Sequence, residues 1–108
     1  MAVPRLTLLA CGDVGPIHEP VGRYAQFVKD AIGRADIRFA QVERVYSERG
    51  NLQLHSGGGH SRLKPHMADV FMQCGFNVLS MASNHAMDWG WRMQCWIPSS
   101  CSGERAYR

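Results

Sequence analysis

Polar side chains that could carry chemistry follow an apolar run near the end of this 108-residue chain. Residues 77–82 read Asn-Val-Leu-Ser-Met-Ala, enough for one buried strand, and Asn84, His85 and Asp88 come shortly after. An amide, an imidazole and a carboxylate at this spacing could bind a metal ion or move a proton. In an open α/β sheet, ligands bind in the crevice beyond the carboxyl ends of the strands. The segment therefore predicts a functional site at the end of a strand.

The same arrangement occurs at two earlier points in the chain. The apolar run 6–10 is followed by Gly12 and Asp13, and the β-rich run 37–42 is followed by Glu43. Because the carboxyl ends of parallel strands lie at one edge of a sheet, we expect these groups to converge with those after residue 82. Carboxylates, an amide oxygen and an imidazole suit divalent ions such as Mn, Mg, Fe or Zn. A histidine beside such ions could protonate a leaving oxygen.

Each of these residues also has an ordinary structural interpretation, as a turn residue, a cap, a surface ion pair or a partner of a backbone carbonyl. Glu43 could pair with Arg44 or Arg49 on the surface. We expect Asp88 to cap a following helix. Four further histidines are expected to be exposed to solvent: His18, His55, His60 and His66.

The segments between the expected strands predict helices that cover the sheet. Apolar residues recur at helical spacing at two places, and Gly33 and Gly75 suit the ends of these helices. Pro65 suits the first turn of the second helix. The glycine- and serine-rich stretch 46–63 is too long for an ordinary connection and predicts a functional or mobile loop. The two apolar stripes consist of Tyr24, Phe27, Val28, Ala31 and Ile32, and of Met67, Val70, Phe71 and Cys74.

Composition limits the class of protein. The length suits one small domain, and the net charge of +3 is spread along the chain without a basic block, so no nucleic acid is expected as a partner. No apolar run approaches the ~20 residues of a transmembrane segment, and we expect no signal peptide. The location therefore stays open, with the cytoplasm as the default. The cysteines lack C-x-x-C spacing and are expected to be free thiols: Cys11, Cys74, Cys95 and Cys101.

The three strand ends resemble the capsule-synthesis CapA family. The resemblance covers about residues 5–90 and is carried by residues 9–14, 35–43 and 75–90 in the right order and spacing. That family is associated with poly-γ-glutamate capsule formation and resembles calcineurin-like metallophosphoesterases. The resemblance implies an α/β fold, the N-terminal fragment of a metallophosphatase-like layered α/β sandwich with a mainly parallel sheet of about three strands.

By position, the resemblance also implies roles for four residues. Asp13 would bind one metal ion, Glu43 would be shared between two ions, and Asn84 would bind the second. His85 would act as the acid toward the leaving group. The implied cofactors are divalent ions (Mn, Mg, Fe or Zn), bound weakly in a fragment, and the implied partner is a capsule polymer or a phosphorylated substrate. We expect an incomplete, inactive fragment, because the further histidine ligands of the related phosphoesterases come from a later half of their fold.

Two regions are expected, a partial CapA-like domain at 1–90 and an aberrant tail at 91–108. Permitted codons for residues 93–108, read in a shifted frame, encode an amphipathic helix with a glycine stop. A small insertion or deletion near residues 91–93, in the gene or its sequencing, would explain this, and a genuine variant with its own tail is the alternative. Two other functions stay open: a non-catalytic α/β module that binds an anion or polymer, and a non-functional truncation product.

Overall fold

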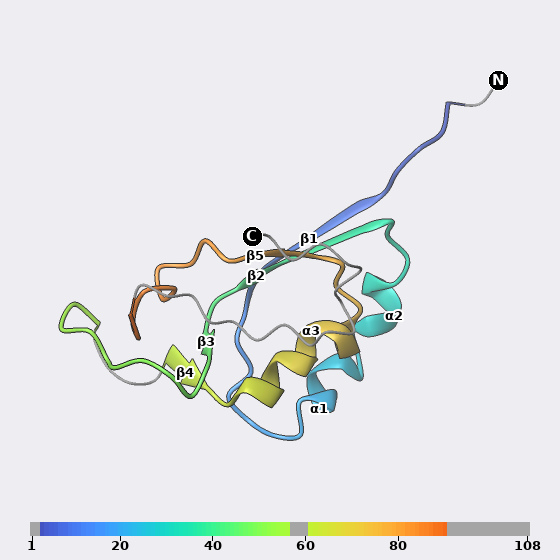
Figure 1. Ribbon diagram of the computed structural model, residues 1–108. Helices are drawn as coiled ribbons and strands as arrows, with labels where there is room; N and C mark the ends of the chain where they lie inside the picture. The colour runs from blue at the N-terminus through green and yellow to red at the C-terminus, as the bar shows by residue number, and fades with distance from the viewer. Residues whose placement is uncertain (1–2, 57–60, 91–108) are drawn as a thin grey trace.

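Three parallel strands form the centre of the molecule in the computed structural model, which describes residues 3–56 and 61–90 (Figure 1). They are β1 (Leu8–Val14), β2 (Ile37–Val42) and β5 (Val78–Ser80), in the spatial order β1-β2-β5. The α/β class and the mainly parallel sheet of about three strands are confirmed. The bounds of β2 agree with the β-rich run in the sequence, whereas β5 is shorter than its apolar run.

Strand β1 extends further than the apolar run 6–10 predicts. Its register against β2 shifts between Ala10 and Asp13, and beyond the shift Asp13 is opposite Gln41. Such a bulge lets a strand continue past residues that would otherwise end the pairing. Asp13 is therefore part of the strand and does not lie in the loop that follows it.

The single helix predicted around residues 24–32 is wrong. The structure has two short helices, α1 (Gly22–Ala25) and α2 (Lys29–Ile32). Between them Val28 donates its backbone N–H to the carbonyl of Ala25 at 3.1 Å, a three-residue turn that interrupts the α-helical ladder. The expected apolar stripe is consequently broken: Phe27 is 84% exposed, and the core receives Ala25 and Ile32.

The second predicted helix is confirmed in its stripe and its end. Pro65 opens the 3₁₀ turn η2 (Pro65–Ala68), which continues into α3 (Asp69–Cys74). Gly75 ends α3 in the left-handed conformation with φ 85°, which glycine adopts at little cost. The four stripe residues are buried as predicted: Met67, Val70, Phe71 and Cys74.

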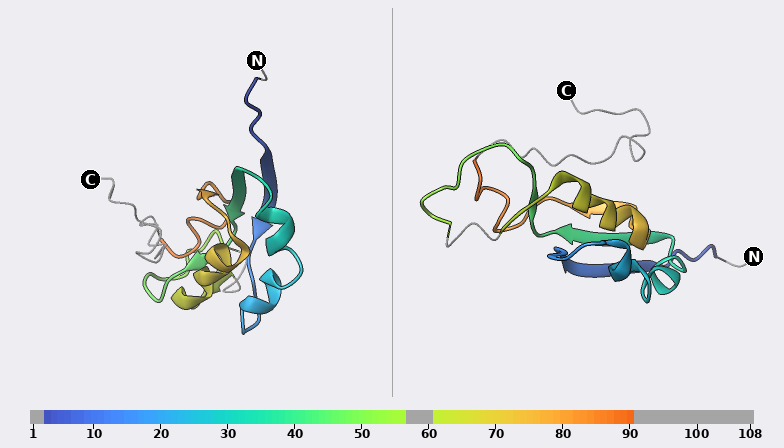
Figure 2. Two further views of the ribbon diagram at one scale, coloured as in Figure 1. Left: turned by 90° about the vertical axis from the view of Figure 1, so that its right-hand side faces the viewer. Right: turned by 90° about the horizontal axis from the view of Figure 1, so that it is seen from below.

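The hydrophobic core lies between the sheet and the helices, all of which are on one side of the sheet (Figures 1 and 2). Phe71 is at its centre, with ring centroids 5.7 Å from Tyr46 and 6.4 Å from Phe76 in edge-to-face arrangements. Ala40 and Val42 of β2 face this core and are buried. The thiols of Cys11 and Cys74 are free, as expected.

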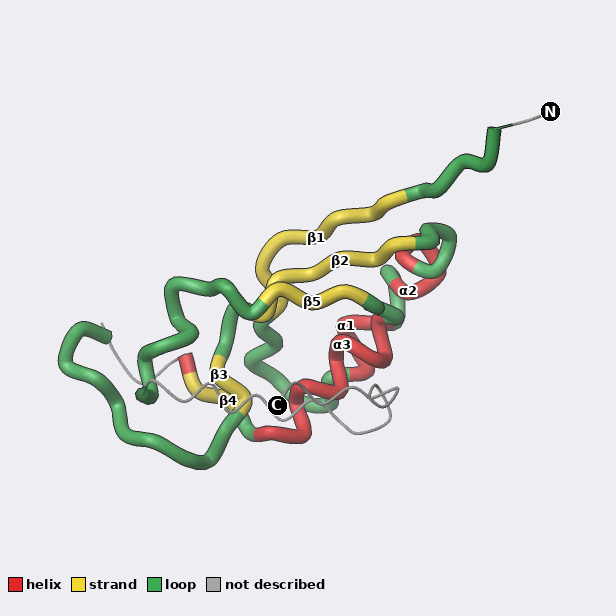
Figure 3. Tube along the Cα trace, turned by 45° about the horizontal axis from the view of Figure 1, so that its top comes forward, coloured by secondary structure: helices red, strands yellow, loops and turns green. Residues whose placement is uncertain are grey.

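The long stretch 46–63 is bracketed by a second, two-stranded parallel sheet of β3 (Val45–Tyr46) and β4 (Arg62–Leu63). Figure 3 shows this pair and the adjoining loops at the end of the main sheet where its strands finish. The predictions for His60 and for the tail 91–108 fall outside the described residues. Within 3–56 and 61–90, the structure contains no helix that is long and apolar enough to cross a membrane.

Candidate functional site

The carboxyl ends of β2 and β5 are joined by hydrogen bonds through Ser83. Its hydroxyl donates to the backbone carbonyl of Glu43 at 3.0 Å and accepts the backbone N–H of His85 at 3.2 Å. The end of β1 adjoins the same edge, since Glu43 donates its N–H to the carbonyl of Val14 at 3.4 Å. The three strand ends therefore meet at one edge of the sheet.

The imidazole of His85 is held between two carboxylates. Its Nδ1 lies 2.7 Å from Asp88 Oδ2, and its Nε2 lies 3.9 Å from Glu43 Oε1. We predicted that Asp88 would cap a helix, but the structure shows its carboxylate bonded to His85. The Asp88 side chain is buried, whereas that of His85 is 21% exposed, so the ring joins a buried anion to an accessible edge.

The surroundings of Asp88 favour its ionised form. Burial by itself would raise the pKa of Asp88, but hydrogen bonds from His85 and Ser61 lower it, and the charges of His85 and His55 act in the same direction. The net result is a pKa below the ordinary value of an aspartate. An ionised Asp88 can accept a hydrogen bond from Nδ1–H of His85. Nε2 of the same ring is then able to give or take a proton.

The two carboxylate oxygens of Glu43 face different side chains. Oε2 accepts a hydrogen bond from Arg44 Nε at 2.9 Å, and Oε1 faces His85. The ion pair between Glu43 and Arg44, one of the two pairings that the sequence allows, is therefore present. Gly15 makes room for it, because a Cβ at that position would collide with Glu43 Oε2 and lie 2.7 Å from Arg44 Cγ.

Asp13 and Asn84 lie at the same edge of the sheet, but both are exposed. Asn84 Oδ1 is 3.5 Å from Ser83 Oγ. Within the described part of the chain, no three His, Cys, Asp or Glu side chains are grouped so that they could hold a metal ion. The oxygen donors of Glu43 and Asn84 fit a hard divalent ion chemically and supply only part of its coordination. A metal site of Asp13, Glu43 and Asn84 stays a prediction.

Hydrogen bonds and a ring contact of residues that no sequence motif singles out join the loop after β3 to the turn 83–90. Arg62 donates from Nε to the carbonyl of Ser47 at 2.7 Å and from Nη2 to that of Arg49 at 2.6 Å. The same guanidinium lies 4.1 Å from the centre of the Trp89 ring, whose Nε1 donates to Ser61 Oγ at 3.1 Å. No local sequence pattern joins Arg62 to Trp89, because they are far apart along the chain.

The backbone of this loop also contacts the turn that carries Asp88. Gln53 donates its N–H to the carbonyl of Asp88 at 2.8 Å. Gly50 has φ 88°, and a Cβ there would collide with the carbonyl of Trp89. These contacts place His55, which is 62% exposed as predicted, with Nε2 3.9 Å from Asp88 Oδ1. Asp88 therefore lies between two histidines from different loops.

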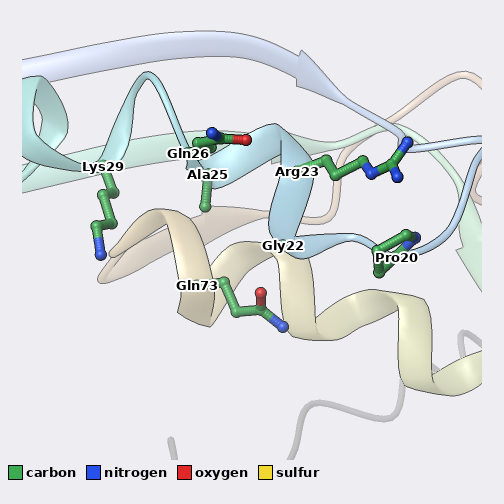
Figure 4. Close-up of a pocket in the computed structure, with 7 residues that line it drawn as sticks. All are labelled: Pro20, Gly22, Arg23, Ala25, Gln26, Lys29 and Gln73. Atoms are coloured by element: carbon green, nitrogen blue, oxygen red, sulfur yellow. The ribbon is translucent and has the colours of Figure 1, made fainter.

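Among the described residues, cavities lie beside the helices. One, of about 560 Å³, is lined mainly by apolar residues of β1, α1, α2 and α3. Another, of about 590 Å³, lies between α1, α2 and α3, and its lining includes the polar residues Arg23, Lys29 and Gln73 beside Pro20 and Ala25 (Figure 4). The second cavity shares no residue with the His85 site.

The structure thus defines an α/β protein with a carboxylate–histidine pair at the carboxyl edge of a small parallel sheet. Residues 7–93 match the family model described as bacterial capsule synthesis protein PGA_cap, and the chain belongs to this family. The CapA-family resemblance is therefore confirmed.

Two curated relatives are uncharacterized proteins of Sinorhizobium fredii, y4sH and y4uA. Each is 29% identical to this chain over 98 residues, which are 82% of this chain and 21% of the relative. The chain therefore spans about a fifth of the length of these relatives. No solved structure shows a significant match.

Proposed function

We propose that this capsule synthesis protein carries part of a metallophosphoesterase-type site that acts in poly-γ-glutamate capsule formation. The observation that supports this most directly is the His85 imidazole, bonded to a buried carboxylate on one side and facing Glu43 on the other. A buried aspartate that orients a histidine is an arrangement suited to proton transfer.

His85 is the residue that moves a proton. Asp88 accepts the hydrogen bond from Nδ1 and stabilises the imidazolium, so Nε2 can deliver a proton to a leaving oxygen. Asp88 is a positioning residue in this proposal. It acts through the imidazole and makes no contact of its own with the substrate.

Glu43 and Asn84 would hold a divalent ion, together with Asp13 from the neighbouring strand. When bound, such an ion activates a water molecule and polarises the phosphoryl or acyl group under attack. Because the chain spans about a fifth of its curated relatives, we infer that further ligands come from polypeptide outside the matched segment. The chain alone is then expected to bind the ion weakly and to be inactive.

A Mn²⁺ titration followed by thermal unfolding tests the metal-binding part of the proposal. Mn²⁺ should raise the melting temperature of the wild-type chain, and Glu43→Gln and Asn84→Ala should each abolish the rise. Asp30→Asn, which changes an exposed carboxylate on α2, should leave it intact. A rise of the same size in all four proteins, or no rise in the wild type, would contradict the proposal. Phosphate binding that ignores both site substitutions would favour the anion-binding module instead.

A further inference from the structure

Two residues that the proposed proton transfer does not use, Ser61 and Trp89, adjoin the buried carboxylate of Asp88. Ser61 lies directly before β4, and Trp89 follows Asp88 in the turn 83–90. The Ser61 side chain is 0% exposed, and its Oγ accepts the indole N–H of Trp89 at 3.1 Å. The same hydroxyl is hydrogen-bonded to the carboxylate of Asp88. One buried hydroxyl therefore connects the indole to the carboxylate that holds His85.

The donor and acceptor roles in this set of hydrogen bonds follow from the chemistry of the side chains. The indole Nε1–H of Trp89 can only donate, so Ser61 Oγ is the acceptor in that contact. A serine hydroxyl has a single proton, and an ionised carboxylate only accepts, so the proton of Ser61 is available to Asp88. The bonds therefore run in one direction, from Trp89 to Ser61 and from Ser61 to Asp88. The carboxylate also accepts Nδ1–H of His85 at 2.7 Å.

Burial makes these donors important for Asp88. Its exposed fraction is 4%, so water has little access to the carboxylate. A buried carboxylate that lacks hydrogen-bond donors takes up a proton more easily, and a protonated Asp88 would hold the Nδ1–H of His85 less strongly. Within the described part of the chain, the charged groups that face Asp88 are the imidazoles of His85, on the same turn, and of His55, on the loop after β3. Ser61 adds a neutral donor to these two rings.

The Trp89 ring is held at its edge and at its face by consecutive residues of the chain. Ser61 accepts its N–H, and the guanidinium of Arg62 lies 4.1 Å from the centre of the ring. Arg62 is itself held by the carbonyls of Ser47 and Arg49, at 2.7 Å and 2.6 Å. A ring that is contacted in both places keeps its plane, and with it the direction of its N–H.

We propose that Ser61 is a positioning residue for His85, on which it acts through Asp88, and that Trp89 fixes the direction of the Ser61 hydroxyl. The inference deepens the proposed function and rests on it, because the orientation of His85 matters only where this ring transfers a proton. It gives the stretch 46–63 a role, since the end of that stretch supplies a donor to Asp88. Neutral His85 then keeps its proton on Nδ1, and Nε2 faces Glu43 unprotonated.

NMR spectroscopy of the 108-residue chain, without metal or substrate, tests the inference. The carboxyl ¹³C signal of Asp88 reports its pKa, and the ring ¹⁵N signals of His85 report the tautomer at about pH 8.5, where imidazoles are neutral. Ser61→Ala should raise the pKa of Asp88, because the ionised form loses a hydrogen bond. The ratio of the Nδ1–H to the Nε2–H form of His85 should fall roughly fivefold. Trp89→Phe keeps the Ser61 hydroxyl and should shift both readings in the same direction by less.

Ser47→Ala is the matched control in the same loop. Ser47 is 6% exposed, and its hydroxyl accepts the backbone N–H of Arg49 at 3.0 Å. This variant should lose stability and leave the pKa of Asp88 and the tautomer of His85 unchanged.

The inference would be overturned by unchanged readings in Ser61→Ala, or by shifts of equal size in Ser47→Ala. Circular dichroism checks the folding of each variant. If Ser61→Ala does not fold, Trp89→Phe decides, and the absence of a shift in that variant would also overturn the inference. The measurement involves neither metal nor turnover, so its outcome is separate from that of the Mn²⁺ titration.

Discussion

The 2.7 Å contact between His85 Nδ1 and Asp88 Oδ2 determines which ring nitrogen of His85 faces Glu43. Glu43 is in turn held by Arg44, so His85 and Glu43 are each positioned by a hydrogen bond to a side chain that is mostly buried. At the scale of single residues, the site is therefore organised by Asp88 and Arg44. Neither belongs to the ligand set that the family resemblance implies.

Asp88→Asn should destabilise the fold by about 1–3 kcal/mol at neutral pH, because it removes a charge-assisted bond to His85 from a buried position. The measurement is urea unfolding of the variant and the wild type. Asp30→Asn, an exposed change on α2, should alter stability by no more than about 0.5 kcal/mol.

The effect of Asp88→Asn should depend on pH in a defined direction. The folded-state pKa of Asp88 lies below its usual 3.8, so the ionised carboxylate stabilises the fold above that value. This contribution is lost as the pH falls through the lower folded-state pKa. The difference between variant and wild type should therefore shrink below about pH 4. A difference that stays constant from neutral pH to pH 3 would show that Asp88 contributes by packing alone.

At the scale of elements, the loop after β3 and the turn 83–90 form one unit. Arg62, at the start of β4, donates to carbonyls of the loop and lies over the Trp89 ring of the turn. Gly50 allows the loop backbone to approach the turn closely. The long stretch 46–63, for which the sequence predicts a functional or mobile loop, is thus joined, over its described part, to the segment that carries the His85–Asp88 pair.

Gly50→Ala should loosen this unit. A residue with a Cβ pays about 1–2 kcal/mol for the left-handed conformation, and here it also collides with the carbonyl of Trp89. Unfolding stability should fall by at least that amount, and hydrogen exchange should accelerate in 47–56 and 84–90. Gly12→Ala is the matched control, because φ is not positive there and a Cβ would meet no atom within 4 Å. Equal stability of the two variants would contradict the close approach.

At the scale of the whole molecule, the core is one-sided and small. Phe71 packs against Tyr46 on β3 and against Phe76, which precedes β5. On the opposite face of the sheet Leu8 is 63% exposed and Val78 is 44% exposed, so the stability of the described part of the chain depends heavily on the packed side. A domain with a small core is expected to have a low free energy of unfolding, since even well-packed domains reach only about 5–15 kcal/mol.

Phe71→Ala should therefore cost about 3–5 kcal/mol and leave much of the protein unfolded. Phe27→Ala removes the same side chain from a position that is 84% exposed and should change stability by less than about 0.5 kcal/mol. Urea unfolding of both variants is the measurement. A large loss for Phe27→Ala would mean that the apolar stripe of the predicted continuous helix is buried after all.

The amino-acid sequence by itself determined the features that depend on local periodicity. Strand 37–42, the buried stripe from Met67 to Cys74 and the left-handed glycine after it follow from spacing and residue type alone. So does the meeting of three strand ends at one edge, because successive parallel strands place their carboxyl ends together.

Only the tertiary structure decided which residues that are distant in the sequence contact one another. The partner of Asp88, the position of Arg62 over Trp89 and the break between α1 and α2 all depend on the packing of the folded chain. The side of the sheet on which α1, α2 and α3 pack is likewise known only from the folded chain. The physical reason is that hydrogen bonds and packing between residues distant in sequence leave no periodic trace in the chain, whereas helices and strands do.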